Sequence, residues 1–483
     1  MRTCCISILV ILSVLTGTSN NVEIEWPNMP VLYITTVDGI TPTCTIVNAP
    51  VGCIGTSITD NSYIPGRMVM VLNGDTLYDS KEYVDNVSGM KIKIRGNSTG
   101  AMLAQHPYKL KLTKKYDLLR RGDNDFKHKK WLLLSMYTWN KTFSNEESNV
   151  LNIAGMLVSK ILKKEWTPEY EFVNMVLNGE YQGMYYLMES VDKGPKRIDI
   201  SDDGFLIEHD TFWWNEDIYF KTNHQSYETG YTYKYPDSDD INDSIQNMVQ
   251  SYMNNVEECL YSQGNIADYI DLESFAKWIL IHDIIGTDDS AGCNRFLCRH
   301  DMNPDTKLQM GPVWDYDSMF RSNELSALHY SQQWFYYPLL FERDDFKQVY
   351  LNLWEQVKPT LISEFQEGIS KANNLYSESF DKSMKIHQTK YPNEGHQSFA
   401  SQMDEIMEKM EKRVEIVDSI ITKTIILSSI NKISEKASLT GITDYKGNSF
   451  NISNSKQLPQ GVYLFKYSDG HIRKVVINSV NNY

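Results

Sequence analysis

The front of the chain alternates apolar and polar side chains with a period of two, which is typical of half-buried β-strands. The clearest segments are 67–74 (RMVMVLNG), 90–97 (MKIKIRGN) and 107–115 (PYKLKLTKK). Farther on, segment 170–190 holds two apolar-rich runs joined by Asn178-Gly179, a pair that favours a tight β-hairpin. Residues from about 30 to 200 are therefore predicted to form strands and hairpins.

Helical periodicity interrupts this region once and dominates after about residue 240. Within 144–164, four apolar residues fall on one helical face: Val150, Ile153, Leu157 and Ile161. A second helix is marked by Leu272, Phe275, Trp278 and Ile279, and a long third by Phe399, Met403, Met407, Met410, Val414, Val417 and Ile421. The segment 437–483 returns to strands and turns. The pattern predicts an α+β, two-lobed body with a small appended β module.

The N-terminus has the order of regions found in a secretory signal peptide. Arg2 gives a positive start, Ile6 to Leu15 form an apolar stretch, and Thr16 to Ser19 are small enough for cleavage. No later segment reaches 18 apolar residues, so we expect no transmembrane segment in the mature protein. Residues 1–20 are thus predicted to direct export, against the alternative of a buried N-terminal strand.

Charge and cysteine content exclude some classes of protein. The net charge of −15 over 483 residues argues against a nucleic-acid binder, because such proteins depend on clustered Lys and Arg. Two of the seven cysteines lie in the predicted signal peptide, which leaves an odd number and no disulfide scaffold. Cys44 with Cys53, or Cys293 with Cys298, can still close short loops in an oxidising compartment.

A cluster of basic and small polar residues follows the early strands. Arg95 to Thr99 form a turn whose backbone N–H groups can face phosphates, and Lys109 and Lys111 lie on one face of the next strand. Taken alone, such lysines are more often ordinary solvated strand residues.

Acidic residues appear later in an order suited to phosphoryl transfer. Asp288 is followed by Asn294 and then, after a strand-like segment, by Asp315 and Asp317 in GPVWDYD. This order is similar to that of protein kinases, in which an Asp orients the acceptor hydroxyl while a later Asn and Asp bind Mg²⁺. Each acid alone is equally consistent with a loop charge.

Together these segments resemble the CotH kinase family over roughly residues 30–425. The resemblance is carried by RGNST with PYKLKL, LNGEYQGMYYLMES, GTDDSAGCN and GPVWDYD, in that order. It implies an atypical protein-kinase fold, with an N-lobe at about 30–190 and a C-lobe at about 191–430. It also implies a secreted or surface-located enzyme that transfers the γ-phosphoryl group of ATP to Ser or Thr of exported proteins, with Mg²⁺.

The resemblance also implies roles for individual residues. It makes Asp288 the catalytic residue, with neighbouring Asp289 as the alternative, and makes Asn294 a partner in catalysis and metal binding. Asp315 is the leading Mg²⁺ ligand and Asp317 the second. The remaining residues are assigned to ATP: Arg95, Asn97 and Ser98 in the phosphate turn, Lys109 and preferably Lys111 on the strand, and Met188, Glu189 and Ser190 as a hinge, with Glu189 for the ribose.

Two positions depart from the family pattern. Leu151-Asn152 stands where the family often has Arg-Asn, and Gly286 stands where an Asn usually precedes the catalytic Asp. A Lys–Glu pair across the cleft can use either Glu146 or Glu147. These departures leave a second hypothesis open, a non-catalytic surface adhesin on a degenerate kinase-like scaffold.

The C-terminal tail and the acidic residues each allow another interpretation. The tail around LPQGVYLF and KVVI resembles the secretion-sorting modules of Bacteroidota proteins, with an ordinary terminal β fragment as the alternative. A third hypothesis, a glycoside hydrolase with paired carboxylates, accounts for the acidic residues but not for the lysine strand and the hinge.

Overall fold

The computed structural model describes residues 26–136, 150–225, 228–287, 294–316, 319–320, 335–393, 397–422, 439–444, 446–451, 458–459, 461–467 and 472–477. Some residues discussed above lie outside the described residues: 1–20, Glu146, Glu147, Asp288, Asp289, Cys293 and Asp317. The chain divides into two compact units, Met1–Val414 and Glu415–Tyr483.

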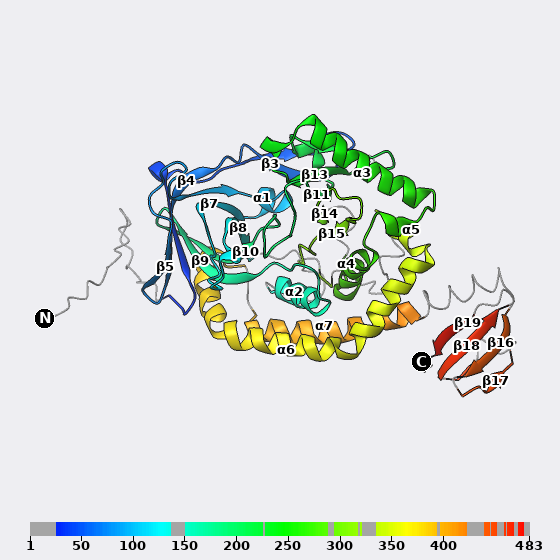
Figure 1. Cartoon of the computed structure of the whole chain (residues 1–483). Helices are drawn as coiled ribbons and strands as arrows, with labels where there is room; N and C mark the ends of the chain where they lie inside the picture. The colour runs from blue at the N-terminus through cyan, green and yellow to red at the C-terminus, as the bar shows by residue number, and fades with distance from the viewer. Residues whose placement is uncertain are drawn as a thin grey trace. The chain divides into compact units, whose positions relative to one another are not determined.

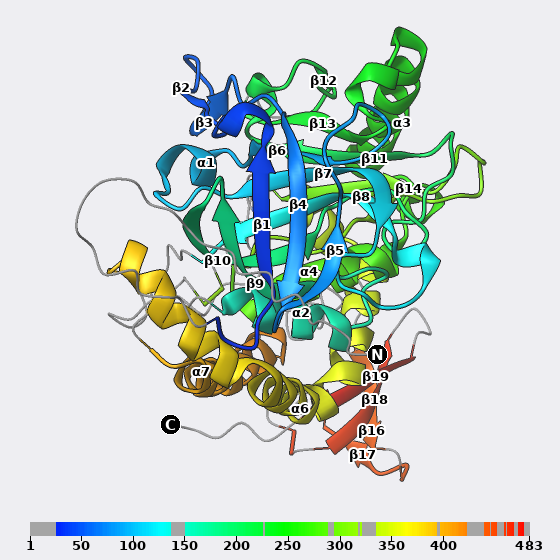
Figure 2. The same ribbon diagram turned by 90° about the vertical axis from the view of Figure 1, so that its left-hand side faces the viewer.

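The first sheet has eight strands and closes on itself (Figures 1 and 2). Their order is β1-β9-β10-β8-β7-β6-β4-β5, and an additional pairing of β1 with β4 joins the two sides. Neighbours are antiparallel except β1 and β9. The strands are β1 (Val31–Thr36), β4 (Ile64–Leu72), β5 (Asp75–Asp79), β6 (Met90–Ile94), β7 (Tyr108–Tyr116), β8 (His128–Ser135), β9 (Tyr170–Leu177) and β10 (Glu180–Glu189).

Alternation along these strands separates a buried interior from an outer face. Ile92, Leu110 and Leu133 belong to one apolar cluster inside the closed sheet. Their neighbours in sequence, such as Lys109, point to the outer face, as the period of two predicts. Asn178 and Gly179 both have positive φ, 50° and 84°, as the predicted tight turn requires.

A second sheet of five strands follows, in the order β12-β13-β11-β14-β15. All of its pairings are antiparallel. The strands are β11 (Phe205–Asp210), β12 (Tyr219–Phe220), β13 (Gly230–Tyr235), β14 (Arg295–Arg299) and β15 (Gln309–Met310). The chain from about residue 240 is mainly helical as predicted, but β14 and β15 lie within it and complete this sheet. A separate hairpin pairs β2 (Thr45–Asn48) with β3 (Thr56–Thr59).

Helices surround this second sheet and fill the later part of the chain. They are α1 (Ser98–Met102), α2 (Leu151–Ile161), α3 (Asp243–Tyr261), α4 (Leu272–Ile285), α5 (Tyr337–Phe341), α6 (Asp344–Lys390) and α7 (Phe399–Ile420). The 3-10 turns are η1 (Val37–Gly39), η2 (Asn124–Phe126), η3 (Trp213–Asn215), η4 (Ser238–Asp240) and η5 (Ile266–Asp268). The helices predicted within 144–164, around 272–279 and at 399–421 are confirmed as α2, α4 and α7.

The longest helix, α6, was not predicted from the sequence. It packs against α2, α4 and β10, and the two views show it beside α7 (Figures 1 and 2). The contact with α7 includes the rings of Phe380 and Phe399, whose centroids are 4.9 Å apart. The first compact unit is therefore strand-rich in its N-terminal part and helical in its C-terminal part.

The second unit contains a four-stranded sheet in the order β17-β16-β18-β19. Its strands are β16 (Leu439–Asp444), β17 (Ser449–Phe450), β18 (Gly461–Tyr467) and β19 (Ile472–Ile477). A small core of its own is formed by Ile442, Leu458, Tyr463, Phe465 and Val475. Strands in 437–483 are thus confirmed, while the sorting role stays a prediction. Across the described part of the chain, no helix has the length and apolar character needed to span a bilayer.

Candidate functional site

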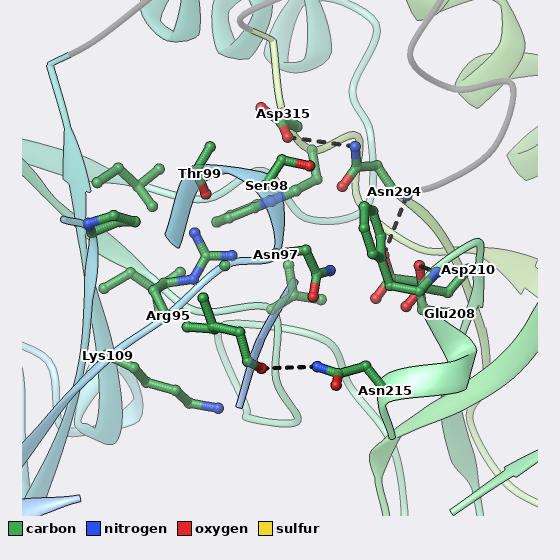
Figure 3. Close-up of a pocket in the computed structure, with 18 of the residues that line it drawn as sticks. Arg95, Asn97, Ser98, Thr99, Lys109, Glu208, Asp210, Asn215, Asn294 and Asp315 are labelled. Atoms are coloured by element: carbon green, nitrogen blue, oxygen red, sulfur yellow. Dashed lines mark hydrogen bonds between the residues drawn. The ribbon is translucent and has the colours of Figure 1, made fainter. Parts of the chain in front are cut away.

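A cavity of about 1040 Å³ lies between the outer face of the closed sheet and the second sheet. Its walls include parts of β3, β6, β7, β8, β10, β11, β13 and β14, together with Asn294 just before β14 and the segment that follows β15. Figure 3 shows that residues far apart in sequence, such as Arg95 and Asp315, point into the same space. The volume lies at the upper end of the range for small-molecule sites.

One wall carries the predicted phosphate turn. Arg95, Asn97, Ser98 and Thr99 all line the cavity after the end of β6. Gly96 allows the turn, because its φ is +88° and a Cβ atom there would lie 2.3 Å from Oγ1 of Thr99. Burial lowers the pKa of Arg95, and the negative charges of Asp315 and Glu208 act against that shift. The structure therefore brings this predicted turn to the cavity.

Lys109, but not Lys111, lines the same wall. The two lysines share the outer face of β7 as predicted, yet Lys111 is exposed and lies away from the cavity. The preference for Lys111 is therefore corrected: the strand period fixes the face, but the cavity covers only one end of it. Burial, with help from the charge of Lys130, lowers the pKa of Lys109 to about 8. Among the described residues, Lys109 has no acidic partner within ion-pair distance.

Asn294 and Asp315 meet at another side of the cavity. Nδ2 of Asn294 lies 3.5 Å from Oδ2 of Asp315, and both residues line the cavity (Figure 3). Both have positive φ, 60° and 64°. Asp288 and Asp317, the other two residues of the predicted acidic set, lie outside the described residues.

Three charged residues of the second sheet line the cavity and were missed in the sequence. They are Glu208 and Asp210 on β11 and Lys234 on β13. Burial and the nearby charge of Glu208 raise the pKa of Asp210 to about 7. The signal that could have found them is the pair of acids two residues apart in FLIEHD, an otherwise buried strand where carboxylates are costly.

The structure places only part of the predicted hinge at the cavity. Met188, Ser190 and Val191 line the cavity, as adenine contacts would require. Glu189 does not: it is 1% exposed and its Oε1 lies 2.9 Å from Nη2 of Arg121 and 3.6 Å from Nε of Arg197. The assignment of Glu189 to a ribose is therefore corrected, because its carboxylate is occupied by a buried ion-pair network.

Hydrogen bonds link strand β3 of the hairpin β2–β3 and the 3-10 turn η3 to the predicted phosphate turn. Nδ2 of Asn215 donates to Oγ of Ser57 at 2.8 Å and to the carbonyl of Ile58 at 2.9 Å. Oγ of Ser57 in turn donates to Oδ1 of Asn97 at 2.7 Å. These bonds connect η3, β3 and the predicted phosphate turn, and nothing in the spacing of these residues predicted the link.

The helix α2 supports the segment that carries Asp315. Oδ1 of Asn152 accepts a hydrogen bond from the backbone N–H of Tyr316 at 3.4 Å. Gly155 faces the Tyr316 ring so closely that a Cβ atom would lie 1.9 Å from Cδ1. The retained Asn of Leu151-Asn152 thus holds the segment next to Asp315, while Leu151 is buried as an apolar residue.

The donor set fits Mg²⁺ bound together with phosphates. Mg²⁺ prefers oxygen ligands and often uses one or two carboxylates or amides, with phosphate oxygens and water completing its shell. Asp315 and the amide oxygen of Asn294 are such ligands. Within the described residues, no group of three or more His, Cys, Asp or Glu side chains is placed to hold a metal ion.

Comparison with known proteins identifies one family. A family model described as CotH kinase protein matches residues 92–417, which include the phosphate turn, the hinge and the segment with Asp315. No curated protein matches the chain.

Proposed function

The chain belongs to the CotH kinase family, and we propose that it is an exported kinase that transfers the γ-phosphoryl group of ATP to Ser or Thr of other exported proteins. In this proposal the closed sheet forms an N-lobe and the second sheet with its helices forms a C-lobe. The observation that carries the proposal is the cavity, where Arg95 and Lys109 face a shared space with Asn294 and Asp315.

Each part of the cavity has a role in the proposed reaction. Arg95, Lys109 and the turn at Asn97 and Ser98 would hold the phosphates by charge and backbone N–H groups. Asn294 and Asp315 would hold Mg²⁺, which when bound neutralises developing charge on the phosphate oxygens. Met188 and Ser190 would contact the base.

The acceptor hydroxyl would be oriented by Asp288, the residue that the family pattern marks as catalytic. Because phosphoryl transfer of this kind needs no covalent intermediate on the protein, positioning and electrostatics would supply most of the rate enhancement.

The direct test is incubation of the purified chain with radiolabelled ATP and a mixture of Ser/Thr-containing exported proteins. We expect Asp315→Ala to lower incorporation by about 10²-fold or more, as loss of a transition-state electrostatic contact commonly does. Lys111→Met is the matched control, since Lys111 lies outside the cavity and should retain normal incorporation. Equal labelling by wild type and Asp315→Ala would contradict the proposal.

The second candidate is a surface adhesin that has lost nucleotide binding, favoured by Leu151 in place of the family's Arg. Mg²⁺-ATP at 100 times its dissociation constant stabilises a binding protein by about 2.7 kcal/mol. A melting scan with and without Mg²⁺-ATP separates the two: a rise in Tm supports the kinase, and an unchanged Tm supports the adhesin.

A further inference from the structure

Glu208 on β11 lies between Lys234 and Asn294 and contacts both. Its Oε1 accepts a hydrogen bond from the backbone N–H of Asn294 at 3.2 Å, and its Oε2 lies 2.8 Å from Nζ of Lys234. All three residues line the cavity, and Figure 3 shows Asn294 between Asp315 and Glu208. We propose that Glu208, held by Lys234, is a positioning residue that sets the affinity of the site for the divalent cation bound with nucleotide.

The order of strands in the second sheet explains how Glu208 contacts both neighbours. β11 lies between β13 and β14, with Glu208 paired in register to Thr232 on one side and Phe296 on the other. Asn294 comes immediately before β14 begins at Arg295. A carboxylate on the central strand can therefore contact a cation from one neighbouring strand and a backbone N–H from the other.

A β-bulge accounts for the position of Lys234. The register passes from Leu206 opposite Tyr235 directly to Ile207 opposite Tyr233, which leaves Lys234 as the extra residue of β13. Bulges of this kind redirect a side chain away from regular alternation and occur often beside active sites. Here the redirected ammonium group lies against Glu208 in the cavity wall.

Stability alone gives little reason for this ion pair. Glu208 is only 8% exposed, and taking two charges out of water offsets most of the attraction between them. Apolar residues of similar volume would serve the fold equally well or better. A charged pair at this place is better explained by what Glu208 does for Asn294.

Asn294 needs such support because of its backbone. Its φ of 60° is in the left-handed region, which costs a non-glycine residue free energy unless surrounding contacts hold it. The hydrogen bond to Glu208 fixes its N–H, while its side chain extends to Asp315 at 3.5 Å. Residues that orient metal ligands in this way typically change metal affinity by about 10- to 100-fold when removed.

The inference rests on the proposed function, and calorimetry of the full chain with a non-hydrolysable ATP analogue tests it. The measured quantity is the ratio of Kd without Mg²⁺ to Kd with Mg²⁺. We expect Glu208→Ala to lower this ratio by about 10-fold or more, with the metal-free Kd changed by less than about 2-fold. Glu208→Gln should give an intermediate ratio, because its amide oxygen still accepts the N–H of Asn294.

Lys347→Met is the control for loss of an ion pair outside the cavity. Lys347 is 8% exposed, pairs with Asp344 at 2.8 Å on α6 and lies outside the cavity, so the ratio should stay at the wild-type value. If Glu208→Ala does not fold, Glu208→Gln alone decides. A wild-type ratio in both Glu208 variants would overturn the inference and leave the proposed function intact. Wild type that binds no nucleotide would overturn both.

Discussion

The charge of Lys109 lies in a poorly solvated wall, next to other cations. Burial and Lys130 together lower its pKa to about 8, so its ammonium form is less stable than that of a solvated lysine and would be stabilised by a nearby anion. A phosphate group in the cavity would supply that anion. Lys111, one pleat farther along β7, is exposed and has no such role to fill.

We therefore expect Lys109→Met to weaken Mg²⁺-ATP binding by about 10-fold or more, as loss of a charge-assisted contact of about 1.5–3 kcal/mol implies. Wild-type affinity should also fall as pH rises through about 8, because the free lysine then loses its proton. Binding titrations at pH 7 and pH 9 measure both effects. Lys111→Met should bind like wild type, and equal weakening by the two substitutions would contradict the assignment of Lys109.

Asp210 gives a prediction about stability. Burial and the charge of Glu208 raise its pKa to about 7, whereas an unfolded Asp has a pKa near 3.9. Between these values the folded state holds a proton that the unfolded state has lost, so this group's contribution to stability is full below about pH 4 and declines as pH rises to about 7. Asp210→Asn stays neutral and should therefore melt at a higher temperature than wild type at pH 8, and near the same temperature at pH 4.

Asp79 is the control, because its pKa is shifted in the opposite direction to that of Asp210. Its hydrogen bonds with Arg67 lower its pKa, so the carboxylate contributes stability above the unfolded pKa that is lost as pH falls. Asp79→Asn should accordingly melt below wild type at pH 8. Melting curves in which Asp210→Asn gains nothing at pH 8 would show that Asp210 is ionised without penalty in the folded chain.

At the scale of elements, α2 packs tightly against the segment that carries Asp315. Gly155 lies against the ring of Tyr316, which is itself fully buried. Asn152, one turn earlier on α2, accepts the backbone N–H of the same tyrosine. The helix thus fixes the residue next to Asp315 by both shape and hydrogen bonding.

Gly155→Ala tests that packing. Replacing a helical glycine by alanine normally stabilises a helix by about 1 kcal/mol, but overpacking a tight core costs about 1–3 kcal/mol. With a Cβ atom placed 1.9 Å from Cδ1 of Tyr316, the steric cost should exceed the gain. We expect a lower free energy of unfolding in urea and weaker Mg²⁺-ATP binding.

Gly194→Ala is the comparison, because its nearest neighbour atom lies at an ordinary contact distance of 3.5 Å. It should leave both the free energy of unfolding and nucleotide binding near wild type. A Gly155→Ala variant as stable as wild type would mean that Tyr316 can move without cost.

Local periodicity predicted the elements that have one buried and one solvated face. The strands β4, β6 and β7, the turn at Asn178-Gly179 and the helix α2 were all found in this way. β11 escaped because every residue in it is buried and no alternation marks it, whereas β14, equally buried, was expected only as a strand-like segment between Asn294 and Asp315. The same burial hid Glu208, whose role depends on which strands lie beside β11.

At the scale of the whole molecule, the two compact units have separate apolar cores. The core of the closed sheet belongs to the first unit, and the cluster of Ile442, Leu458, Tyr463, Phe465 and Val475 lies wholly in the second. All the cavity-lining residues belong to the first unit as well. Among the described residues, the C-terminal strands thus contribute none to the cavity wall.

A chain that ends after Thr422 tests whether the first unit is independent. Because the described core and cavity contain no residue of β16 to β19, we expect its main melting transition to stay within about 2 °C of that of the full chain, which corresponds to a change of no more than about 2 kcal/mol in a domain larger than 250 residues. Mg²⁺-ATP should stabilise both chains equally. A shortened chain that aggregates or melts well below the full chain would show that the C-terminal unit supports the fold rather than serving an export or surface role alone.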